Sequence, residues 1–235
     1  MSESAGARPS GAASSSLRWA GVLLVVGTLE FVVGMVVAQI GYGSAYSLSN
    51  NLISDLGVTA CGVVDGTGRY ACSPWWYVFD GTLVVFGAMI TAGLLRARSA
   101  FGPARFGSLG AALLVVNALG VLAAGAIPEN VGYAAHSAFA LIAFAAGSVG
   151  LIVIAIGLYR APEFGPSWAA YSTGSGVVGV IALALFIGGN DVGLGAGGME
   201  RLIVAPILLW FLLCGAQLLR ASVRPASVTP SPSKP

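Results

Sequence analysis

The amino-acid sequence predicts an all-α polytopic membrane protein, a bundle of six transmembrane helices with one long extracytoplasmic loop. Charged residues make up 9% of the 235 residues, where a soluble domain carries roughly 25%. Hydrophobic residues account for 57% of the chain, and its mean hydropathy is +0.88. A water-soluble protein is therefore excluded, and the apolar residues are gathered in six long runs that carry almost no charge.

Each of the six runs is long enough to cross a bilayer, because a helix needs about 20 apolar residues to span the hydrocarbon core. We predict transmembrane helices at residues 19–40, 75–95, 106–127, 133–158, 168–188 and 202–219. They form one membrane domain over residues 19–220, in which residues 41–74 are the long loop. The Ser-, Ala- and Pro-rich segments 1–18 and 221–235 are predicted to be disordered cytoplasmic tails.

Basic residues are distributed unevenly between the two sides of the predicted bundle. One side carries Arg8, Arg18, Arg96, Arg98, Arg105, Arg160, Arg220, Arg224 and Lys234, and the other carries only Arg69 and Arg201. Because basic loops stay in the cytoplasm, we expect a multi-pass protein of the cell membrane with both termini cytoplasmic. The lipid bilayer is its predicted partner. The net charge of +2 and the scattered basic residues exclude a nucleic-acid-binding surface.

Pairs of small residues four positions apart indicate closely packed helices. They are Gly34 with Ala38, Ala143 with Gly147, and Ser172 with Gly176. Such faces serve packing within one chain or in a homo-oligomer, and the sequence leaves both open.

The first half of the long loop has an apolar stripe of Leu52, Ile53 and Leu56. This spacing predicts a short helix, capped by Ser49 or Asn50, that lies on the membrane surface or over the bundle.

The second half of the loop carries a hairpin signal. The turn sequence Asp-Gly-Thr-Gly at residues 65–68 lies between Val63-Val64 and Arg69-Tyr70, which predicts two short antiparallel strands. Cys61 and Cys72 flank these strands. A disulfide between them is chemically allowed in an oxidising exterior, and two free thiols are the alternative.

Several ionisable residues lie at or near the predicted outer face, where an intramembrane charge indicates function. Asp80 and His136 lie at similar depth, and Glu200-Arg201 begins the sixth helix after the outer loop that follows the fifth. With Asp55 of the long loop they predict one outer polar pocket. The alternative is structural, with Asp80 as a hydrogen-bonded helix staple and Glu200 with Arg201 as a local ion pair.

Glu30 and Asn117 lie near the middle of the first and third spans. They form a hydrogen-bonded pair if these two helices pack together, and a proton or cation relay is the rival interpretation.

The chain resembles a bacterial and archaeal six-helix family known as domain of unknown function 998. The resemblance covers roughly Trp19 to Arg220 and depends on Tyr46 through Ser54-Asp55-Leu56-Gly57, on Gly125 to Asn130 followed by His136, and on Gly198 to Arg201. It implies an integral membrane protein with no established activity. Asp80 stands where the family more often has Asn, and the hairpin with its two cysteines is a local elaboration.

Ser54, Asp80 and His136 together also resemble the Ser, Asp and His set of the ceramidase and adiponectin-receptor-like membrane hydrolases, which hold zinc through three histidines. This sequence contains one histidine. A three-His zinc site is thus excluded, although His136 with carboxylates could still bind a metal. We predict no other cofactor.

Three functions follow from these residues. As an enzyme or binding protein for a lipid or lipid-linked headgroup, the pocket would use His136 as general acid or base, Asp80 or Asp55 to orient it, and Arg201 to hold an anionic group. As a transporter, the protein would use Glu30 as its relay. As a scaffold, it would present the hairpin to a partner.

Overall fold

The computed structural model describes residues 11–42, 46–64, 66–102 and 105–223. Its long helices are α1 (Gly11–Tyr42), α2 (Trp76–Ala97), α3 (Arg105–Ala126), α4 (Tyr133–Leu158), α5 (Pro166–Ile187) and α6 (Gly195–Ser222). Within the described residues, six helices are long and apolar enough to cross a membrane, which confirms the predicted class. Large apolar side chains such as Val33 and Ile181 are exposed on the outside of the bundle, where lipid takes the place of water.

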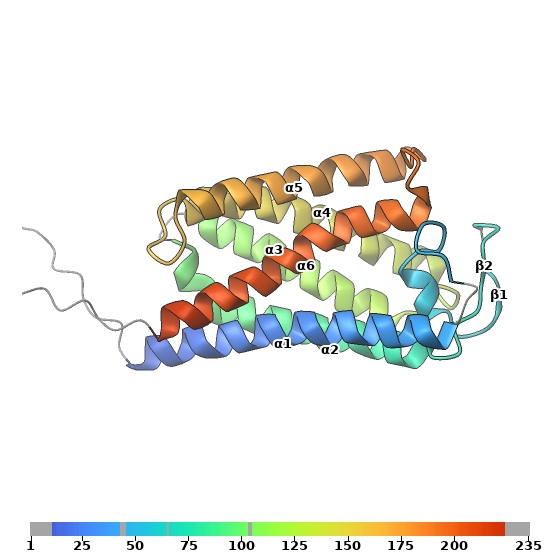
Figure 1. Ribbon diagram of the computed structural model, residues 1–235, viewed down its shortest axis with the longest axis horizontal. Helices are drawn as coiled ribbons and strands as arrows, with labels where there is room; N and C mark the ends of the chain where they lie inside the picture. The colour runs from blue at the N-terminus through green and yellow to red at the C-terminus, as the bar shows by residue number, and fades with distance from the viewer. Residues whose placement is uncertain (1–10, 43–45, 65, 103–104, 224–235) are drawn as a thin grey trace, which may run out of the picture.

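The helices pack as a closed ring in chain order, because each contacts the next and α6 returns to α1. Ser14 at the start of α1 donates to the carbonyl of Ser222 at the end of α6, at 2.8 Å. The hairpin of strands β1 and β2 lies at the opposite end of the bundle (Figure 1). We call that end the hairpin end.

Glycines let neighbouring helices approach within backbone contact. A Cβ at Gly87 of α2 would lie 2.5 Å from the Ala118 carbonyl oxygen of α3, and one at Gly176 of α5 would lie 2.5 Å from the Ser148 carbonyl oxygen of α4. The predicted small-residue faces thus pack between helices of one chain. Gly34 lies against Thr82, and Gly147 lies against Asn117.

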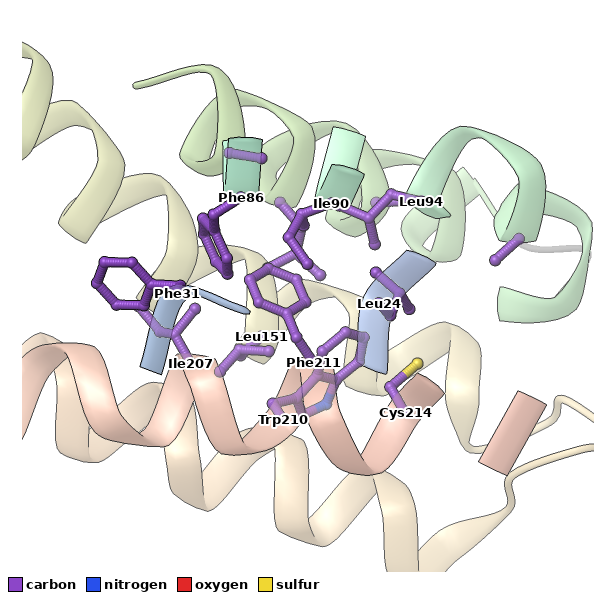
Figure 2. Packing of buried hydrophobic residues seen from close by; sticks show 14 of the residues in the cluster. Leu24, Phe31, Phe86, Ile90, Leu94, Leu151, Ile207, Trp210, Phe211 and Cys214 are labelled. Carbon is purple, nitrogen blue, oxygen red and sulfur yellow. The ribbon is translucent and has the colours of Figure 1, made fainter. Parts of the chain in front are cut away.

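The core inside the ring is built from aliphatic and aromatic side chains (Figure 2). The rings of Phe31 and Phe86 have centroids 5.2 Å apart, and Phe86 and Phe211 follow at 6.1 Å. Trp210 is fully buried and donates its indole N–H to Ser172 of α5 at 2.8 Å. Because lipid is as apolar as these side chains, the cluster stabilises the bundle through close van der Waals packing between helices.

Two helices begin several residues before their predicted spans. Helix α1 begins at Gly11 rather than at residue 19, so residues 11–18 are helical and not part of a disordered tail. Ser16 anchors this turn by donating to the Arg96 carbonyl at 3.2 Å. Helix α6 begins at Gly195 rather than at residue 202. Residues 1–10 and 224–235, the remainder of the predicted tails, lie outside the described residues.

The predicted hairpin is present. Strands β1 (Gly62–Val63) and β2 (Tyr70–Ala71) are antiparallel, with Gly62 opposite Ala71. Cys61 and Cys72 form a disulfide at its base, as one of the two predicted alternatives requires.

The short helix of the loop differs from its prediction. It is the 3-10 helix η2 (Ser54–Gly57), and its preceding residue Ile53 makes no side-chain capping bond. The expected caps Ser49 and Asn50 lie in a separate turn. Ile53 and Leu56 are buried, so the segment lies over the bundle rather than along its outer surface.

Candidate functional site

Asp55 is fully buried in η2 and organises the surrounding loop. Its Oδ2 accepts hydrogen bonds from the Asn51 side-chain amide at 2.9 Å and from the Leu52 N–H at 3.0 Å. Its Oδ1 lies 3.1 Å from Nη2 of Arg69 in the hairpin. The same nitrogen donates to Oε1 of Glu129, in the turn between α3 and α4, at 2.8 Å. One arginine therefore joins two buried carboxylates, and we call this set the carboxylate bridge.

Arg201 holds the first turn of the loop to α6. Its Nη1 donates to the carbonyls of Leu48, Asn51 and Gly197 at 2.9, 3.0 and 2.8 Å, and its Nη2 donates to the Tyr46 hydroxyl at 2.5 Å. Burial raises the pKa of Tyr46 to about 12, so its hydroxyl stays protonated and donates to the carbonyl of Leu52. The guanidinium is thus engaged by backbone oxygens and not by Glu200.

Glu200, the residue before Arg201, is buried in the first turns of α6. Its Oε2 accepts the backbone N–H of Ile53, the residue that precedes η2. This bond joins the start of α6 to the loop. It also explains why α6 begins before the apolar run, since Glu200 and Arg201 both have loop partners.

A cavity of about 70 Å³ lies inside the ring, in the half of the bundle nearer the hairpin end. Its wall is mainly apolar, with Phe31, Phe79, Phe86 and Phe144 among its lining residues. Figure 2 shows Phe31 and Phe86 meeting over the core. Four polar side chains also line the cavity, each from a different element: Ser54 of η2, Asn117 of α3, His136 of α4 and Glu200 of α6.

His136 is buried and its ring is held by the end of α3. Its Nδ1 lies 3.1 Å from the carbonyl oxygen of Ala124 and 2.8 Å from that of Ile127. A carbonyl oxygen only accepts, so Nδ1 carries the proton in this arrangement. In the neutral ring Nε2 is then an acceptor, and it makes no hydrogen bond to the described residues.

Asn117 is also fixed in one orientation. Its Nδ2 donates to the Ala143 carbonyl of α4 at 2.9 Å, while its buried Oδ1 has no partner among the described residues. The hydrogen bond expected between Asn117 and Glu30 is not formed, because α1 packs mainly on α2 and α6 whereas α3 packs on α2 and α4. Glu30 does not line the cavity, and its Oε2 is buried without a partner among the described residues.

The structure thus divides the predicted outer pocket. His136 and Glu200 line the cavity with Ser54, whereas Asp55 and Arg201 belong to the loop contacts. Asp80 is buried beside Gly57 of η2, where a Cβ would collide with its carboxylate. Neither oxygen of Asp80 has a partner among the described residues, so the predicted hydrogen-bonded staple is not formed there.

Two features of the site were absent from the sequence prediction. Nothing in the sequence around Glu129 indicates a contact with Arg69, and only the fold brings the two side chains together. The phenylalanines of the cavity wall have no local signal beyond apolar character. Among the described residues, no three His, Cys, Asp or Glu side chains are placed to hold a metal ion.

The sequence was compared with protein families, curated proteins and solved structures. A family described as protein of unknown function (DUF998) matches residues 6–217. No curated protein matches the chain, and no solved structure does.

Proposed function

This chain belongs to the DUF998 family of proteins of unknown function, and we propose that it binds a lipid-like amphipathic molecule in the cavity of its membrane-spanning bundle. One observation carries the proposal. Ser54, Asn117, His136 and Glu200 come from four elements to one apolar cavity, where Asn117 leaves a buried acceptor unpaired. An apolar pocket with a few convergent polar groups is the usual form of a small-molecule site.

Binding is better supported than catalysis, transport or a scaffold role. Catalysis by His136 was expected to need Asp80 or Asp55, yet backbone carbonyls occupy its Nδ1. Transport was expected to use Glu30, which does not line the cavity. The hairpin is held down by the carboxylate bridge, so it is less available as a free recognition element.

The proposal is tested by filling the cavity from α4. Native mass spectrometry of the protein extracted from its own membrane is expected to detect a bound amphipathic molecule in the wild type. Ala140→Phe places a ring in the cavity and should abolish that peak, whereas Ala138→Phe, at an exposed position of the same helix, should retain it. Equal occupancy in the two variants, or an empty wild type, would overturn the proposal.

We also propose that the hairpin end is extracytoplasmic and that the bundle lies in the cell membrane. Support comes from basic residues near the opposite end of the bundle: Arg18, Arg96, Arg98, Arg105, Arg160 and Arg220. The disulfide at the hairpin fits an oxidising exterior.

Cysteine labelling in intact cells tests this orientation. Val131→Cys is exposed in the turn between α3 and α4, and Ser99→Cys is exposed in η3 (Arg98–Phe101) at the other end. A membrane-impermeant maleimide should label the first variant directly and the second only after permeabilisation. The reverse pattern would show that the bundle is inserted the other way.

A further inference from the structure

Three of the four polar groups of the cavity wall, those of Asn117, His136 and Glu200, share one chemical property, which is that their free atoms accept hydrogen bonds; the fourth, the Ser54 hydroxyl, both donates and accepts. Asn117 illustrates it most directly. Its amide nitrogen is bound to the Ala143 carbonyl at 2.9 Å, so the amide does not flip and Oδ1 is the atom that remains. A buried amide oxygen without a partner has lost its hydrogen bond to water, and a donor from a ligand would replace that bond.

His136 also offers a free hydrogen-bond acceptor to the cavity. The backbone carbonyls of Ala124 and Ile127 accept hydrogen bonds from its Nδ1–H. The neutral ring therefore offers Nε2 as an acceptor to whatever occupies the cavity that it lines.

Glu200 adds negative charge when it is ionised, because a carboxylate accepts hydrogen bonds and donates none. The Ile53 N–H uses one of its oxygens. The lining residues include no Lys or Arg. The nearby guanidinium of Arg201 is occupied by the carbonyls of Leu48, Asn51 and Gly197.

From this wall we propose that the ligand's head is a protonated primary amine on an alkyl chain. This inference rests on the proposed function and names the ligand class for the same cavity. An ammonium group has three N–H donors and one positive charge, which complement the amide oxygen of Asn117, Nε2 of His136 and the carboxylate of Glu200. Phe31, Phe79 and Phe86 surround the apolar part, and their ring faces also attract a cation.

A phosphate or carboxylate head fits this wall poorly. It would set its acceptor oxygens against those of Asn117, His136 and Glu200 and its negative charge against Glu200. The Ser54 hydroxyl is one donor against these three groups, and no Lys or Arg lines the cavity to offset the cost. The volume of about 70 Å³ has room for about five waters, enough for an ammonium group and the first carbons of its chain.

The preference of the cavity for one head group can be measured with three compounds of equal chain length: octylamine, octanol and octanoic acid. At pH 8 the amine is protonated and the acid is ionised, so the two compounds carry opposite charges. Thermal shifts of the detergent-solubilised protein report binding, because a ligand of the folded state raises the melting temperature. We expect octylamine to bind most tightly and octanoate least tightly to the wild type.

Glu200→Gln is the decisive variant, since the Gln amide oxygen still accepts the Ile53 N–H while the negative charge is lost. Affinity for octylamine should fall about tenfold and affinity for octanol should not change. If this variant does not fold, Asn117→Leu should weaken both octylamine and octanol. Octanoate binding as tightly as octylamine, or octylamine binding that neither variant weakens, would overturn the inference.

The cavity-filling pair separates this result from a failure of the proposed function. If Ala140→Phe weakens all three compounds relative to Ala138→Phe while octanoate binds most tightly, the cavity is a ligand site and the amine assignment is wrong. If Ala140→Phe affects none of them, the cavity is not the site, and both proposals fail.

Discussion

The carboxylate bridge and the cavity wall both contain buried polar side chains, yet only the bridge contains ion pairs. In the bridge, the carboxylates of Asp55 and Glu129 share the guanidinium of Arg69 within 3.1 Å. In the cavity wall, Oδ1 of Asn117 and Nε2 of His136 have no partner among the described residues. The difference teaches that burial of a polar residue does not distinguish structure from binding. Both regions contain buried atoms without hydrogen-bond partners, such as Oε2 of Glu129 in the bridge and Oδ1 of Asn117 in the wall. What sets the bridge apart is that its carboxylates are paired with a cation within the protein.

The two regions also differ in the elements that they join. The bridge connects segments close to the hairpin end, namely the hairpin, η2 and the turn between α3 and α4. The cavity lies between transmembrane helices, and its wall includes residues of α1, α2, α3, α4 and α6. Damage to the bridge should therefore appear as lost stability, whereas damage to the wall should appear as lost binding.

The largest expected effect is that of Arg69→Leu. It leaves Asp55, which is 0% exposed, and Glu129, which is 3% exposed, without their shared cation. Removing one member of a buried ion pair costs about 3–5 kcal/mol, because an uncompensated charge stays out of water. Thermal unfolding in detergent, followed by tryptophan fluorescence, should show this loss in the absence of any ligand.

Two controls sharpen that measurement. Arg160→Leu removes an exposed arginine that makes no ion pair with the described residues, and it should leave the melting temperature unchanged. Adding Glu129→Gln to Arg69→Leu should recover part of the loss by removing one stranded charge. If Arg69→Leu unfolds at the wild-type temperature, the carboxylate bridge is not a source of stability.

The fold was largely predictable because a bilayer imposes a minimum length on apolar helices. Helix α4 has the bounds that hydropathy predicts, Tyr133–Leu158. Hydropathy failed at Gly11 and Gly195, where α1 and α6 begin. Hydropathy indicates which part of a helix lies in lipid and not where the helical backbone ends. The additional turns at the starts of α1 and α6 make contacts with residues distant in the sequence.

The site was predictable only in part, because sequence gives the depth of a residue in the membrane but not the direction that it faces. His136 and Glu200 were placed at the correct end and both line the cavity. Asp80 has a similar depth, yet its neighbour Phe79 lines the cavity and Asp80 does not. One residue along a helix turns the side chain by about 100°, and only packing decides which face is inward.

Asn117→Leu should have the smallest effect on stability. The variant loses the hydrogen bond to the Ala143 carbonyl, which keeps its ordinary helical partner within α4, and it also removes the unpaired Oδ1. These two changes oppose each other, so the free energy of unfolding should stay within about 1 kcal/mol of the wild type. Octylamine should nonetheless raise its melting temperature less than it raises that of the wild type. A loss of stability as large as that of Arg69→Leu would instead place Asn117 with the bridge, as a residue that the fold itself requires.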